Sequence, residues 1–70
     1  MRTFTFFLTD QRYSVPTVAF VTARDVERAG ELARERLDES PHHLAIELFE
    51  NDELVGRIDR DGEAWLSAGA

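Results

Sequence analysis

Near its amino terminus the sequence alternates between large apolar side chains and threonines. Phe4, Phe6 and Leu8 take one set of alternate positions, and threonines take most of the other set. Because successive side chains of a β-strand point to opposite faces, this repeat of two predicts a strand over residues 2–9 with one buried face. Phe7 places a large apolar side chain on the threonine face, so that face is not fully polar.

A second strand and a helix are predicted next. Residues 17–22 are rich in β-branched and aromatic side chains, which is typical of a strand. Pro16 suits the start of that strand, because proline donates no ladder hydrogen bond. Thr22 is expected to cap the following helix, and Pro41 opposes its continuation beyond about Glu39.

Turn signals predict how the strands are connected. The polar segment 10–14 predicts a hairpin loop between the first two strands. Asn51-Asp52 predicts a turn between two further strands, at residues 43–50 and 53–59.

The predicted helix carries small apolar side chains along one stripe, which lets it approach a sheet closely. The stripe consists of Ala23, Val26, Ala29, Gly30, Ala33 and Leu37. We therefore predict one α+β domain over residues 1–70, with two layers, an antiparallel sheet and one helix on one face, in the order β-β-α-β-β. Residues 63–67 are expected to add either a short fifth strand or a docked tail, and residues 68–70 to fray.

Alternation also predicts which side chains lie under the helix. From the first, third and fourth strands these are Phe4, Phe6, Leu8, Leu44, Ile46, Leu48, Leu54 and Ile58. The second strand is apolar on both faces. We place Ala19, Val21 and Ala23 under the helix, because they continue its close approach.

This assignment leaves apolar side chains on the far face of the sheet as well. The candidate interface residues are Phe7, Val18, Phe20, Phe49, Val55 and Trp65. An exposed apolar patch of this kind marks an interaction surface. Two explanations stay open: Trp65 and Leu66 cover the patch within one chain, or the chain forms a homodimer through this face or through a strand edge.

The length and the cysteine content bear on that choice. A chain of 70 residues hides only about 60% of its unfolded surface on folding, so its core is small. Cysteine is absent, which excludes a disulfide framework and thiolate chemistry. Small domains without such staples commonly gain stability from a partner subunit, so a homodimer or higher assembly is expected.

Charge and hydropathy limit the expected partners and location. The net charge is −6, and a nucleic-acid binder needs clustered positive charge instead, so nucleic acid is not an expected partner. No segment approaches the roughly 20 apolar residues that cross a bilayer, and the amino terminus lacks the pattern of a signal peptide. We therefore expect a cytoplasmic protein with no membrane partner.

No motif indicates a catalytic, cofactor or metal site. His42 and His43 are adjacent at a strand start, where neighbouring side chains point to opposite faces and cannot easily share one metal ion. The acidic residues from Glu47 to Glu53 resemble a solvated hairpin more than a carboxylate pair across a cleft. The serines lack a nucleophile-elbow context, and the glycines form no phosphate-binding loop. The expectation is a protein that is not an enzyme and holds no cofactor.

Two resemblances are carried by the core pattern. The pattern comprises Met1-x-x-Phe4-x-Phe6-x-Leu8-x-Asp10, then Ala23, Ala29 and Ala33 on the helix, and Leu44-x-Ile46-x-Leu48. It resembles short bacterial domains of unknown function. The order of elements resembles antitoxins of the HicB kind, which implies a strand-and-helix domain that neutralises a partner toxin.

The leading functional hypothesis is therefore a non-catalytic interaction module that associates with itself and binds a protein partner. The alternatives are an accessory domain that binds a small ligand, and an antitoxin-like partner of another protein.

Overall fold

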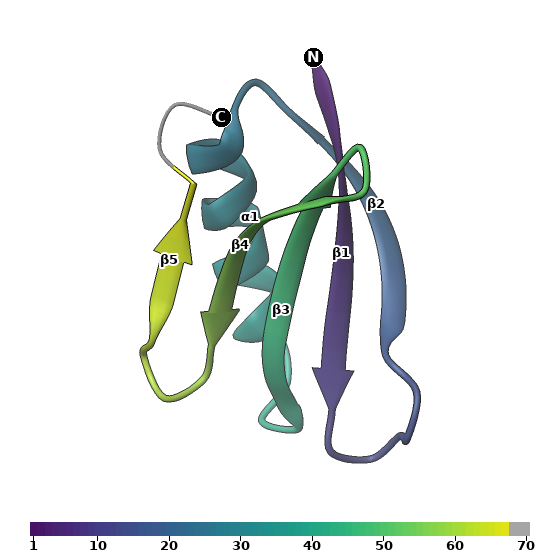
Figure 1. Ribbon diagram of the computed structural model, residues 1–70. Helices are drawn as coiled ribbons and strands as arrows, with labels where there is room; N and C mark the ends of the chain where they lie inside the picture. The colour runs from purple at the N-terminus through teal and green to yellow at the C-terminus, as the bar shows by residue number, and fades with distance from the viewer. Residues whose placement is uncertain (68–70) are drawn as a thin grey trace.

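In the computed structural model, which describes residues 1–67, the elements follow in the order β1 (Arg2–Asp10), β2 (Thr17–Ala23), α1 (Val26–Leu37), β3 (His43–Glu50), β4 (Glu53–Asp59) and β5 (Ala64–Leu66). The strands form one antiparallel sheet in the order β2-β1-β3-β4-β5, and α1 packs on one face of it (Figure 1). The predicted α+β class and two-layer arrangement are confirmed, and residues 64–66 form a fifth strand. The predicted fraying of residues 68–70 lies outside the described residues.

The turn between β3 and β4 has the backbone conformation that a two-residue hairpin requires. Asn51 and Asp52 have φ angles of 51° and 66°, in the left-handed region that asparagine and aspartate tolerate best among residues with a side chain. This conformation matches the right-handed twist of the flanking strands. The turn predicted at Asn51-Asp52 is therefore confirmed.

The helix begins later than predicted. Asp25 is the cap, because its extended backbone precedes the first turn and its carboxylate accepts a hydrogen bond from the Arg28 amide at 2.8 Å. Thr22 was expected in that role, but it lies within β2 and is still paired with β1. The helix ends at Leu37, where the Arg60 guanidinium donates to the Leu37 carbonyl oxygen at 2.8 Å.

The core lies between α1 and the sheet. Every member of the predicted helix stripe is buried, and the side chains of Phe4, Phe6, Ile46 and Leu48 are fully enclosed beneath it. The prediction for β2 also holds, since Ala19 and Val21 are paired with Phe6 and Phe4 and pack against the core.

A β-bulge in β4 exchanges two side chains relative to simple alternation. Leu48 pairs with Gly56 and Phe49 pairs with Leu54, so Val55 is an extra residue in β4. Val55 is only 1% exposed and belongs to the core, whereas Leu54 is 37% exposed. The predictions for both residues were therefore wrong: Leu54 does not lie under the helix, and Val55 does not lie on the far face.

A second bulge, in β3, displaces Leu44. Thr9 pairs with Ala45 and Asp10 pairs with His43, which leaves Leu44 without a partner on β1. Leu44 is exposed rather than buried, and this prediction was also wrong. The His43 ring takes its place on the helix side, where Nδ1 lies 2.8 Å from the Arg36 carbonyl oxygen.

The short strand β5 packs against the helix and β4 through the side chain of Leu66. Leu66 fills a slot between Gly30 on α1 and Gly56 on β4. A Cβ atom at Gly56 would lie 2.7 Å from Leu66 Cδ2, and a Cβ atom at Gly30 would lie 2.9 Å from Leu66 Cδ1. The absence of side chains at these glycines therefore makes room for Leu66.

Candidate interaction surface on the open face of the sheet

The face of the sheet opposite α1, here called the open face, carries two rows of paired side chains. Strand alternation and the pairing register define both rows. The first row runs from β2 to β4 and consists of Phe20, Thr5, Phe49 and Leu54. The second row crosses all five strands and consists of Val18, Phe7, Glu47, Arg57 and Trp65.

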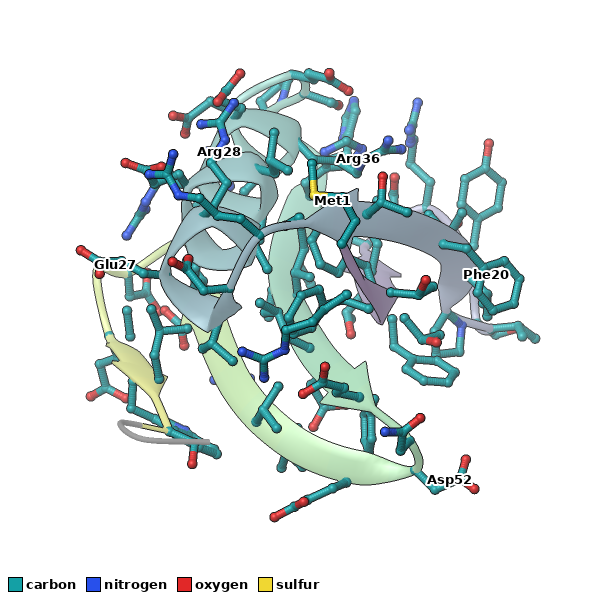
Figure 2. The ribbon with its side chains drawn as sticks, turned by 90° about the horizontal axis from the view of Figure 1, so that it is seen from above. Met1, Phe20, Glu27, Arg28, Arg36 and Asp52 are labelled. Carbon is teal, nitrogen blue, oxygen red and sulfur yellow. The ribbon has the colours of Figure 1, made fainter. Side chains whose placement is uncertain are left out.

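Most of the apolar side chains in these rows are accessible to solvent. Phe20 is 75% exposed and Trp65 is 48% exposed, while Val18 and Leu54 are also exposed. Figure 2 shows Phe20 at the margin of the molecule, pointing away from the helix that carries Glu27 and Arg28. These side chains form a patch of the kind that marks an interaction surface.

Two phenylalanines give the patch a rigid centre. The rings of Phe7 and Phe49 meet edge to face, with centroids 5.1 Å apart and an interplanar angle of 81°. The pair lines a shallow hollow together with Thr5 and Asp52. Both rings are half-buried, so they present shaped apolar surface at little cost in side-chain entropy.

A charged strip interrupts the apolar rows. Glu47 on β3 is paired directly with Arg57 on β4, which places opposite charges side by side in the middle of the open face. Arg57 Nη1 also lies 3.1 Å from Asp59 Oδ2. The pKa of Asp59 is lowered, first by the hydrogen bond from the Asp61 amide and then by the bond from Arg57. The strip therefore offers both a cation and anions to a partner.

Of the six candidate interface residues, Phe7, Val18, Phe20, Phe49 and Trp65 lie on the open face. The remaining candidate, Val55, was wrongly assigned, because the bulge in β4 turns it into the core. Sequence reasoning missed Leu54, which takes the open-face position instead. Gly56 in the strand interior was the available signal, since glycine within a strand often marks a bulge.

A second cluster surrounds Asp10, at the end of β1. Asp10 is buried, and its carboxylate accepts hydrogen bonds from the Arg12 amide and from Arg12 Nη2, both at 2.8 Å. His43 Nε2 lies 3.7 Å from the same carboxylate. The bond from the Arg12 side chain is the largest cause that lowers the pKa of Asp10 to about 2. The cluster ties the first hairpin loop to the start of β3.

Sequence reasoning placed Asp10 in a solvated loop and missed this role. The signal was its position, because Asp10 continues the even-numbered alternation of Phe4, Phe6 and Leu8 onto the helix side of the sheet.

The Asp10 cluster predicts a loss of stability in acid. The folded pKa is about 2 and the ordinary value is 3.8, so the stabilisation is complete above about pH 4 and is lost as the pH falls from about 4 to 2. We expect Asp10→Asn to be less stable than the wild type at neutral pH, with the difference shrinking over that interval. Urea unfolding at a series of pH values measures it. A difference that stays constant down to pH 2 would contradict this role of the carboxylate.

The two histidines point in different directions. His43 faces Asp10, while His42 Nδ1 lies 3.0 Å from Gln11 Nε2 in the exposed loop region. Within residues 1–67 no group of three or more histidine, cysteine or acidic side chains is placed to hold a metal ion. Across the same residues no helix has the length and apolar character to cross a membrane.

Comparison with protein-family models, with curated proteins and with solved structures finds no match to this chain. The resemblances to short bacterial domains and to HicB antitoxins therefore stay predictions. What the described residues offer for binding is the open face and the two edges of the sheet.

Proposed function

We propose that this chain is a non-catalytic interaction module that associates with a second copy of itself through the open face. The observation that carries the proposal is the exposure of large apolar side chains on that face, where Trp65 is 48% exposed and Leu54 is 37% exposed. A monomer in water gains nothing from such a patch, whereas burial of apolar surface stabilises a dimer by about 25 cal/mol per Å² before the costs of association.

The side chains of the open face are arranged so that the open faces of two copies can match each other. A twofold axis that runs parallel to the strands, between β3 and β4, brings β3 of one copy against β4 of the other and β1 against β5, and it leaves β2 outside the contact. Glu47 of one copy then meets Arg57 of the other, because the two residues are paired across that axis. Opposite charges meet across the contact, which favours this orientation over others.

The apolar side chains match under the same axis. Strand order places β1 and β5 at equal distances on either side of it, so Phe7 of one copy faces Trp65 of the other. Phe49 faces Leu54 in the same way, since the two are paired across β3 and β4. Aromatic anchors of this kind contribute most of the binding energy in protein interfaces.

The test compares two exposed aromatic side chains, one on the open face and one off it. Trp65→Lys removes an anchor, and Tyr13→Lys makes the same change at a residue of the first hairpin loop that is 60% exposed. We expect Trp65→Lys to weaken the dimer by about 2 kcal/mol or more, roughly thirtyfold in Kd, and Tyr13→Lys to leave it unchanged. Size-exclusion chromatography with light scattering measures the mass against concentration.

Circular dichroism checks that both variants are folded. Equal weakening by the two substitutions would contradict an interface on the open face. A wild-type chain that stays monomeric would remove self-association and leave the alternative in which a different protein covers this face.

A further inference from the structure

β2 is an edge strand without the usual protection. Among residues 1–67 it has a neighbour on one side only, so half of its backbone amide and carbonyl groups face outward without a partner strand. It is seven residues long, and its sequence, Thr-Val-Ala-Phe-Val-Thr-Ala, contains no charged residue, glycine or proline. Natural edge strands are normally short, charged, bulged or covered, because an open edge recruits another strand.

The opposite edge of the sheet, formed by β5, has features that normally protect an edge strand from pairing. β5 has three residues, and the turn before it carries the acidic residues Asp61 and Glu63. α1 packs mainly over β3 and β4 and contacts β2 less, from the helix side of the sheet. A hollow between α1 and β2 leaves Val21 and Leu32 partly accessible. Of the two edges, β2 is therefore the one that is open to pairing with another strand.

We propose that β2 pairs antiparallel with β2 of a second copy, about a twofold axis normal to the sheet at Phe20. This axis keeps both helices on the same side and joins the two sheets into one of ten strands. Phe20 then lies opposite Phe20, Ala19 opposite Val21, and Val18 opposite Thr22. A strand with a charged residue at its centre would oppose like charges in this arrangement, whereas β2 opposes none.

The edge contact is independent of the proposed open-face contact. The edge axis is normal to the sheet and the face axis lies parallel to it, so the two contacts can coexist. The edge axis lies at the outer side of β2 and the face axis lies between β3 and β4, so the two axes do not intersect, and the two contacts together would build an open chain of copies.

Single cysteines test the edge contact and its register, because the chain contains no cysteine. Directly opposed residues of an antiparallel pair have Cα atoms about 4.5–5.5 Å apart, within the range that a disulfide spans. We expect Phe20→Cys to form a disulfide-linked dimer under mild oxidation. Phe20 is largely exposed, so the substitution leaves the core intact.

Two further variants supply the matched control. Val18→Cys alone should not cross-link, because the two copies of residue 18 are four residues out of register, roughly 13 Å apart. Thr22→Cys alone should not cross-link for the same reason. A mixture of Val18→Cys and Thr22→Cys should cross-link, since these two positions face each other. Non-reducing electrophoresis and mass spectrometry measure the products.

The outcomes separate the edge contact from the open-face contact. Cross-linking of Phe20→Cys that persists when Trp65→Lys is added supports the edge contact independently of the face. A dimer that forms without any Phe20 cross-link would overturn the edge pairing and leave the face contact standing. Cross-linking of Val18→Cys alone, as strong as that of the mixture, would also overturn the register.

Discussion

Val55→Asp is expected to unfold the chain, whereas Leu54→Asp leaves it folded. Val55 is enclosed in the core and Leu54 lies on the open face, because the bulge in β4 sits between Leu54 and Gly56. An unpaired carboxylate at Val55 costs several kcal/mol, against a total stability of about 4–10 kcal/mol for a chain of this length. An aspartate at position 54 stays in water and changes the stability by about 0.5 kcal/mol.

Urea unfolding followed by circular dichroism measures both variants, at a concentration low enough that self-association does not contribute. If Val55→Asp fails to accumulate, Val55→Ala and Leu54→Ala give the same comparison. We expect about 2 kcal/mol of destabilisation for the first of these and much less for the second. A larger loss at Leu54 than at Val55 would mean that β4 alternates regularly and contains no bulge.

Gly56→Ala is expected to destabilise the chain by about 1–3 kcal/mol, because its new methyl group overpacks the slot that holds Leu66. The added Cβ atom would lie 2.7 Å from Leu66 Cδ2 and 3.1 Å from the Trp65 carbonyl oxygen. Adding Leu66→Ala should therefore restore part of the stability that Gly56→Ala removes. The remaining loss should persist, because the new methyl group still lies close to the Trp65 carbonyl oxygen. The coupling energy of this double-mutant cycle is expected to be about 1–2 kcal/mol.

Gly62→Ala provides the control for this cycle. Gly62 has a φ angle of 93° and no neighbour near its Cβ position, so alanine there costs about 1 kcal/mol through backbone strain alone. Leu66→Ala should not change that cost. Equal rescue of both glycine variants by Leu66→Ala would show that the slot is not what seats β5.

The strands whose pairing is regular could be predicted from the sequence. β1 and β2 pair without interruption, so the alternation of Phe4 and Phe6 against Phe7 placed each side chain on its observed face. The helix stripe followed in the same way from small residues at helical spacing. The fold class depends on these elements, which explains why composition and periodicity sufficed for it.

The side-chain orientations that could not be predicted from the sequence are those next to the two β-bulges. One extra residue in β4 exchanges the faces of Leu54 and Val55, and one in β3 replaces Leu44 by His43 on the helix side. Both bulges coincide with tertiary contacts: Leu66 fills the slot at Gly56, and the His43 ring lies within hydrogen-bond distance of the Arg36 carbonyl oxygen in the last turn of the helix. Alternation within one strand carries no information about such contacts, so the candidate surface was predicted with one residue wrong and one missing.

Sedimentation equilibrium of the unmodified chain tests self-association most directly. Measured from low micromolar to near-millimolar concentration, the average mass should rise from the 8.0 kDa of one chain to at least twice that value. An average mass that stays at 8.0 kDa over the whole concentration range would contradict self-association, because Phe20 and Trp65 would then remain exposed to solvent.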